Sequence, residues 1–193
     1  MSKDYYENLK SKLKKYFGED LSFVSSDTMN SIHINRKNLR ELIKMLRDEF
    51  EHQVLVDLFV VDYLDRNERF EVNYNLLSLS KNAGINVKVK IEEKISIPSI
   101  VDLFSTANWL EREAWDMYGV LFEDHPDMRR LLSDYEFEGH PMRKDFPLSG
   151  YKEVGYDLEK RKVVYKPVEL SQAYRDFDFA SPWEGYDELK DND

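Results

Sequence analysis

FEVNYNLLSLSKNAGINVKVKI, the stretch formed by residues 70–91, decides the fold class of this 193-residue chain. In both halves of the stretch, apolar side chains occupy every second position and polar side chains stand between them. A period of two predicts strands with one apolar and one polar face, which is typical of an antiparallel sheet covered on one side only. The more apolar run Val54–Leu64 supplies a third long strand.

Two short strands and two amphipathic helices are predicted on the N-terminal side of this sheet. The strand candidates are Leu21–Ser25 and Ile32–Ile34. Apolar residues at helical spacing form two stripes, the first of Tyr6, Leu9, Leu13 and Tyr16 and the second of Leu39, Leu42, Ile43, Leu46 and Phe50. The expected fold is therefore α+β, with a mainly antiparallel sheet of four to five strands and helices on one face.

A third helix is predicted to begin at Ser99, where Ser99-x-x-Asp102 matches a capping box with Asp in place of the usual Glu. Gly119 is the expected stop. The buried stripe would comprise Leu103, Ala107, Leu110, Ala114 and Met117. The charged residues that fall outside this stripe are Glu111, Arg112, Glu113 and Asp116. Because residues two apart on a helix point in different directions, Glu111 and Glu113 are predicted to form structural ion pairs, not an acid–base pair.

The regular periodicity ends near residue 133, which predicts an α+β domain over residues 1–132 and an extended tail over residues 133–193. One hairpin is expected in the tail, with arms Glu153–Asp157 and Lys162–Lys166. The rest could stay disordered, but 11 of the 26 aromatic residues lie in this tail. Because disordered chains are poor in aromatic residues, the tail is expected to fold by wrapping a partner.

Two prolines are expected to shape the start of this tail. Pro141 and Pro147 favour extended backbone before them, so residues 140–146 should form a fixed extended arc. This arc would aim Arg143 and Lys144 at acidic groups, and Phe146 would act as an anchor.

Residues 125–144 could also carry other chemistry. His125 and His140 could bind a metal ion, but each precedes a proline and no H-E-x-x-H motif supports them. A phosphate could be held by Arg129, Arg130, Arg143 and Lys144, but the glycines form neither a GxGxxG motif nor a P-loop. The residues themselves therefore favour a binding or scaffold protein over an enzyme.

The composition argues against several classes of protein. Without cysteine, the chain forms no disulfide and supplies no thiolate to an iron–sulfur cluster. Residues 1–100 carry equal numbers of acidic and basic side chains, so the net charge of −10 lies in residues 101–193 and disfavours nucleic-acid binding. No apolar run approaches the ~20 residues of a membrane span. The N-terminus has no signal-peptide or transit-peptide features, so a cytoplasmic chain is expected.

Two stretches of the sequence resemble a known family. Residues 110–132, LEREAWDMYGVLFEDHPDMRRLL, and residues 134–151, DYEFEGHPMRKDFPLSGY, closely resemble the thirty-kilodalton (C) subunit of respiratory complex I, the proton-pumping NADH:quinone oxidoreductase. Residues 161–185, RKVVYKPVELSQAYRDFDFASPWEG, resemble the tail of the proteobacterial and mitochondrial branch, which uses ubiquinone. One departure is Glu136, where the family would have glycine.

The resemblance implies a cofactor-free structural subunit in the peripheral arm of that complex. Electrons would pass from NADH through FMN and iron–sulfur clusters of other subunits to quinone, while protons are pumped. The chain would dock on the large quinone-site subunit and on cluster-bearing subunits, at the cytoplasmic side of the bacterial inner membrane. No catalytic, cofactor-binding or metal-binding residue is expected on it. Interface or structural roles are expected for Glu111, Arg112, Glu113, Asp116, His125, Arg129, Arg130, His140, Arg143, Lys144, Phe146 and Trp183.

Two alternatives stay open at this point. Related subunits also serve membrane-bound hydrogenases, which handle no NADH, although the tail resembling the ubiquinone branch disfavours that assignment. A protein of a different class, a free-standing metal-dependent hydrolase, could be built on His125 and His140. Stoichiometric metal in the isolated protein would favour the hydrolase, whereas co-purification with cluster-bearing subunits would favour the scaffold.

Overall fold

The computed structural model describes residues 3–25, 30–134 and 136–175. The chain divides into two compact units, residues 1–148 and residues 149–193. Trp183, for which an interface role is expected, lies outside the described residues, as do Tyr135, Phe177, Phe179 and Tyr186. Within the described ranges, no helix is long and apolar enough to cross a membrane.

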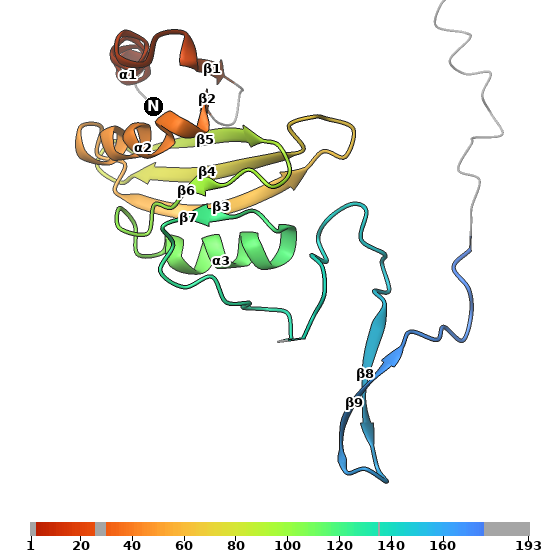
Figure 1. Cartoon of the computed structure of the whole chain (residues 1–193). Coiled ribbons are helices and arrows are strands. Elements are labelled where there is room, and N and C mark those ends of the chain that lie inside the picture. Colours follow the sequence, from red (N-terminus) through yellow and green to blue (C-terminus); the bar gives the residue numbers. More distant parts are fainter. Residues whose placement is uncertain (1–2, 26–29, 135, 176–193) are drawn as a thin grey trace, which may run out of the picture. The chain divides into compact units, whose positions relative to one another are not determined.

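The first unit is built on one five-stranded sheet (Figure 1). The strands stand in the order β1-β2-β5-β4-β3, in which β2 and β5 run parallel and the other three neighbouring pairs run antiparallel. The mainly antiparallel sheet and the α+β class predicted from the sequence are thereby confirmed. The strand bounds are Leu21–Ser25 for β1, Asn30–Ile34 for β2, Val54–Asp62 for β3, Phe70–Ser78 for β4 and Ala83–Ile91 for β5.

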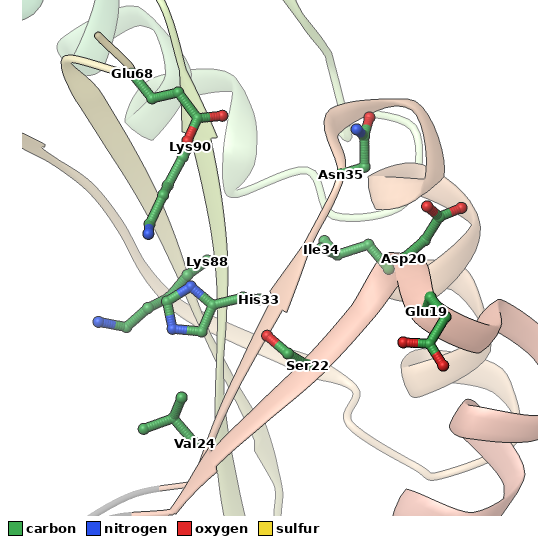
Figure 2. A pocket seen from close by; sticks show the side chains of 10 residues that line it. All are labelled: Glu19, Asp20, Ser22, Val24, His33, Ile34, Asn35, Glu68, Lys88 and Lys90. Atoms are coloured by element: carbon green, nitrogen blue, oxygen red, sulfur yellow. The ribbon is translucent and has the colours of Figure 1, made fainter. Parts of the chain in front are cut away.

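The alternation in residues 70–91 sorts the side chains of β4 and β5 onto two faces. Val72, Tyr74 and Val87 point into the core and are fully buried. On the other face, Asn73 stands opposite Lys88 and Glu71 stands opposite Lys90. Lys88 pairs with the Glu71 carboxylate at 3.1 Å. Figure 2 shows His33, Lys88 and Lys90 at a shallow hollow that β1, β2 and β5 line on this polar face.

Helices supply the other side of the core. Their bounds are Lys3–Phe17 for α1, Leu39–Asp48 for α2 and Ala107–Tyr118 for α3, with short 3-10 turns at Gly18–Asp20 (η1) and Arg36–Asn38 (η2). The most complete burial is in α2, where the four residues of the predicted stripe that fall within the helix are inaccessible: Leu39, Leu42, Ile43 and Leu46. Each fully buried side chain of this size contributes ~1.5–3 kcal/mol to stability. Helix α3 packs beside β3 and adds Ala107 and Ala114 to the same core (Figure 1).

The predicted start of the third helix is wrong, because the residues of the supposed capping box have tertiary partners. The Ser99 hydroxyl donates to the Glu111 carboxylate at 2.6 Å, and Asp102 pairs with both guanidinium Nη atoms of Arg40. Residues 99–106 therefore form turns before α3 begins at Ala107. The predicted stop is confirmed, because Gly119 caps the helix with a φ of 78°.

Two short strands brace the ends of this helical region. Ile97–Pro98 forms β6 and pairs in parallel with β7, Phe122–Glu123. Since β6 precedes α3 and β7 follows it, this pairing ties the two flanks of the helix together.

The first unit ends at residue 148 and so extends past the expected boundary at 132. Beyond that boundary, the backbone N–H of Ser133 is bonded to Asp116 of α3, and that of Lys144 is bonded to Asp62 of β3. The second unit contains the hairpin predicted from the sequence. Its strands are β8, Lys152–Asp157, and β9, Lys162–Pro167. Residues 149–193 of the expected tail make up the second unit.

Candidate functional site

Three of the four charged residues of α3 are buried, which the apolar stripe did not predict. The side chains of Glu111 and Asp116 are fully buried and Arg112 is 9% exposed, whereas Glu113 is exposed. The stripe places only one face of α3 against the core. The segment that follows the helix, residues 129–134 and 136–146, folds back and contacts a second face, and is called the returning segment below. Charged side chains between the two layers must therefore find polar partners inside the protein.

Asp116 is the most heavily bonded of these residues. Its Oδ2 atom accepts the backbone N–H groups of Leu131, Leu132 and Ser133 at 2.9, 2.7 and 2.9 Å. Its Oδ1 atom accepts from Nη1 of Arg130 at 2.7 Å. Burial alone would raise the pKa of Asp116, but the three N–H groups and the guanidinium outweigh it and hold the pKa well below its usual range. Asp116 thus fixes the backbone of the returning segment.

Arg112 bonds the same segment from the preceding helical turn. Its Nε and Nη2 atoms donate to the backbone carbonyls of Arg129 and Arg130 at 3.1 and 3.3 Å. The guanidinium lies over the Trp109 ring, 5.2 Å from its centroid, and Nη1 is 4.0 Å from an Asp127 carboxylate oxygen. Arg112 and Asp116 therefore present donors and acceptors, one turn apart, to consecutive peptide groups.

Glu111 faces the opposite way, toward the loop before α3. Its carboxylate accepts the Ser99 hydroxyl at 2.6 Å and the backbone N–H of Ile100 at 2.8 Å. Burial raises the pKa of Glu111 to about 7, although these two hydrogen bonds oppose the shift. The nearest cationic candidate is His125, whose Nε2 atom lies 3.9 Å from the carboxylate. The ion pair predicted for Glu111 is therefore replaced by neutral hydrogen-bond donors.

Replacing Glu111 with glutamine is expected to remove a pH dependence of stability. The folded pKa, about 7, exceeds the ordinary value of 4.5, so the folded state binds more protons than the unfolded state between these pH values. Stability of the wild type should therefore fall by about 3 kcal/mol as pH rises from 4.5 to 7. In urea unfolding followed from pH 5 to 8, Glu111→Gln should flatten this trend and should be the more stable protein at pH 8. Glu113→Gln, at an exposed position of the same helix, is the control that should retain the wild-type trend. Parallel curves for the wild type and Glu111→Gln would contradict the assignment.

His125 is committed to backbone hydrogen bonds. Its Nδ1 atom accepts the N–H of Asp127 at 3.0 Å, so Nε2 carries the proton and donates to the carbonyl of Asn108 at 3.2 Å. Both ring nitrogens are thus used, and the side chain is fully buried at the start of α3. Across the ranges that the structure describes, no group of three His, Cys, Asp or Glu side chains is placed to hold a metal ion.

His140 packs at the other end of α3. Its Nδ1 atom lies 3.0 Å from the carbonyl oxygen of Asp116, and its ring stands edge-on to Trp115. Close packing here requires Gly119, because a Cβ at that position would lie 2.6 Å from the His140 ring and from Nη2 of Arg143. The positive φ at this position also favours glycine, which has no Cβ to clash with the backbone. One glycine thus both ends the helix and admits the returning chain.

Arg143 fastens the returning segment to the end of α3 and to the loop that follows β5. Its Nε atom donates to the Tyr118 carbonyl at 2.6 Å, and Nη1 pairs with Glu93 at 2.7 Å. The prediction that Arg143 meets an acidic group is confirmed, whereas Lys144 uses its backbone N–H, which donates to Asp62 at 2.8 Å. The predicted extended arc is wrong. Residues 140–146 form consecutive turns, in which the backbone N–H groups of Arg143 and Phe146 donate to the carbonyls of His140 and Arg143.

Phe146 is anchored within the first unit. Its ring lies 5.8 Å from that of Phe137, and its edge leaves no room for a Cβ at Gly139, where φ is 99°. The remaining basic residue of the predicted set, Arg129, projects outward with a side chain that is 81% exposed and pairs with Asp127 at 2.7 Å. The predicted set thus separates into buried bonding groups and a few exposed side chains.

A second buried charge centre was not anticipated from the sequence. Arg69 donates through Nε and Nη2 to Asp62, at 2.7 and 2.9 Å, and through Nη2 and Nη1 to Asp145, at 2.7 and 3.1 Å. Asp62 ends β3 and Arg69 immediately precedes β4, so the two flank the β3–β4 connection, whereas Asp145 belongs to the returning segment. The available signal was the pair of opposite charges flanking the predicted β3–β4 turn.

The fold and this site define a class of protein: an α+β domain whose C-terminal segment is fastened to one helix and to the sheet by buried charged groups. Residues 32–152 match the model of the family described as respiratory-chain NADH dehydrogenase, 30 Kd subunit, and the chain belongs to this family. The matched range includes most of β2, the strands β3 to β5, α3 and the whole returning segment.

Individual relatives carry the similarity beyond that range. The chain is 57% identical over 154 residues to the C subunit of NADH-quinone oxidoreductase from Rhodospirillum rubrum, covering 79% of this chain and 72% of the relative. It is 48% identical over 184 residues to the corresponding protein of Mesorhizobium japonicum, covering 92% of each chain. Among solved structures, a chain of the membrane-bound sulfane sulfur reductase, an archaeal respiratory membrane complex, superposes with a TM-score of 0.63. That superposition covers 74% of this chain and 86% of the other at 21% identity, and it shows a shared fold.

Proposed function

We propose that the chain is a structural, cofactor-free subunit in the peripheral arm of a proton-translocating NADH:quinone oxidoreductase. The observation that carries this proposal is the similarity to the C subunit of NADH-quinone oxidoreductase over 92% of the chain. The site supports it, because the described charged groups of α3 and the returning segment are largely engaged with one another and with the backbone. Electron transfer from NADH through FMN and iron–sulfur clusters to quinone would then belong to other subunits.

The proposed partners are the large quinone-site subunit and the cluster-bearing subunits, at the cytoplasmic side of the bacterial inner membrane. Docking on a protein surface requires exposed apolar area. The region around α3 and the returning segment exposes such side chains: Trp109 is 59% exposed, Leu132 63% and Met142 54%. This surface stands on the buried charge network, so the network would keep the docking residues in a fixed arrangement.

Neither alternative has comparable support. The archaeal respiratory complex shares the fold with this chain, but the close relatives are named as NADH-quinone oxidoreductase subunits, not as hydrogenase subunits. A hydrolase based on His125 and His140 would need free ring nitrogens, and His125 uses both of its nitrogens for backbone contacts.

Affinity purification of the tagged chain from bacterial membranes tests the proposal. The full chain should co-purify with cluster-bearing and quinone-site subunits, identified by mass spectrometry. A chain ending at Leu148, which keeps the whole first unit, should recover at least ~10-fold less of them if the second unit contributes one to two anchoring contacts. The isolated chain should bind no FMN, NADH or iron. A flavin spectrum or one equivalent of iron in the isolated chain, or the absence of cluster-bearing subunits from the full-chain sample, would contradict the proposal.

A further inference from the structure

The β8–β9 hairpin of the second unit has one apolar and one charged face. Val154 stands opposite Tyr165, and Tyr156 stands opposite Val163. Because successive residues of a strand point to opposite sides, these four side chains share one face. The other face carries the cross-strand pairs Glu153–Lys166, Gly155–Val164 and Asp157–Lys162.

The apolar face is exposed to solvent. Its residues Val154, Tyr156, Val163 and Tyr165 are 58%, 62%, 56% and 43% exposed. On the charged face, by contrast, Val164 is only partly accessible. An isolated two-stranded hairpin is marginally stable in water, and a contiguous exposed apolar face marks an interaction site. Burial of this apolar face against a partner would therefore stabilise the hairpin.

The charge of the hairpin narrows the class of partner. Residues 152–167 contain more basic than acidic side chains, although the whole chain has a net charge of −10. Lys160, Arg161 and Lys162 are consecutive at the turn, where Lys160 lies 3.6 Å from the Asp157 carboxylate. A partner with acidic side chains beside an apolar groove complements this arrangement.

The other candidate occupants fit less well. A second copy of the hairpin would bring two basic turns into one interface, and like charges oppose association. The sheet face of the first unit that carries Asn73, Asn86 and Lys88 is polar, and Asn73 and Asn86 are themselves buried, so it offers little apolar surface.

We propose that the face formed by Val154, Tyr156, Val163 and Tyr165 binds an apolar groove, bordered by acidic side chains, on another subunit of the assembly. This inference rests on the proposed function and deepens it by assigning one docking surface. Each buried aromatic ring removes ~150–250 Å² from water, so Tyr156 and Tyr165 would dominate the contact.

Two adjacent valines give a matched test. Val163 belongs to the apolar face and Val164 to the charged face of the same strand. Each full-length variant, Val163→Glu or Val164→Glu, would be co-expressed with the wild type, and their ratio in the purified membrane complex measured by mass spectrometry. Val163→Glu should be incorporated about 30-fold less than the wild type, as expected for a residue at the centre of an interface. Val164→Glu should be incorporated nearly equally.

Equal incorporation of both variants would overturn the inference while leaving the proposed function intact. Equal loss of both would attribute the effect to hairpin formation and would also overturn the assignment of a face. NMR chemical shifts of the full-length variants would show whether β8 and β9 still form. If wild-type chain itself never enters the complex, the proposed function fails. A photo-reactive residue at Tyr156 identifies the occupant: an adduct with another subunit supports the inference, and an adduct with a second copy or with residues 1–148 refutes it.

Discussion

Asp116→Ala should lower the free energy of unfolding by ~3–5 kcal/mol, the range expected when a buried, fully bonded charged group is removed. The substitution leaves three backbone N–H groups, those of Leu131, Leu132 and Ser133, without their acceptor. It also leaves the Arg130 guanidinium without its carboxylate. Urea unfolding at pH 7 measures the loss, and hydrogen exchange at residues 131–133 should accelerate with it. The unfolding free energy measures the stability of the whole domain, whereas hydrogen exchange at residues 131–133 measures local release of the returning segment, so the two effects can be told apart.

The pH dependence of the loss has a defined sign. The pKa of Asp116 is held below its usual range, so the stabilisation is present above the ordinary carboxyl pKa and disappears as pH falls below it. The difference between the wild type and Asp116→Ala should therefore shrink below about pH 4. Glu113→Ala is the matched control, because Glu113 is an acidic residue of the same helix with an exposed side chain. Its loss should stay within ~0.5 kcal/mol, and an equal loss in both variants would refute the role assigned to Asp116.

Arg69→Met should also destabilise the protein by ~3–5 kcal/mol, because it strips a buried carboxylate of its counter-charge. The Asp62 side chain is fully buried, and Arg69 is 9% exposed. Methionine retains much of the length and the apolar stem of arginine. The loss of stability in Arg69→Met should therefore come mainly from the missing charge and less from the smaller side-chain volume. Asp145, which is about half exposed, can turn to solvent and adds less to this penalty.

Two comparisons check the Arg69 prediction in the same urea titrations. Arg129→Met removes an arginine that also pairs with an aspartate, but its side chain is 81% exposed, so the loss should be below ~1 kcal/mol. Combining Arg69→Met with Asp62→Asn should recover part of the stability, because the uncompensated charge is removed. If the double variant is as unstable as the sum of the single variants, charge compensation is not the cause.

The strands were predictable because their period is a geometric property of the backbone. Alternation in residues 70–91 gave β4 and β5 nearly to their ends, and the arms of the hairpin were placed within one residue. The start of α3 was not predictable, because the side chains of Ser99 and Asp102 have partners distant in sequence and so do not cap a helix. Local chemistry was outweighed by tertiary contacts.

The burial of the charged residues on α3 escaped sequence reasoning for a different reason. A helical stripe predicts the face that meets the sheet, but it contains no information on whether another segment covers a second face. Residues 131–146 lack periodicity, so their return to α3 was invisible, and the boundary was expected before them. The sequence singled out Glu111, Arg112 and Asp116, but their hydrogen bonds could be read only from the folded chain.

In the returning segment, the Oδ2 atom of Asp116 binds backbone peptide groups and not side chains. Every amino acid except proline supplies the N–H that Oδ2 accepts, so positions 131, 132 and 133 can exchange their side chains without losing the bond. Leu132, which is 63% exposed, is one of these positions and belongs to the proposed docking surface. Exposed side chains of the docking surface can thus change while the hydrogen bonds to Asp116 beneath them are kept. Recognition of a partner and stability of the fold can therefore evolve independently at these positions.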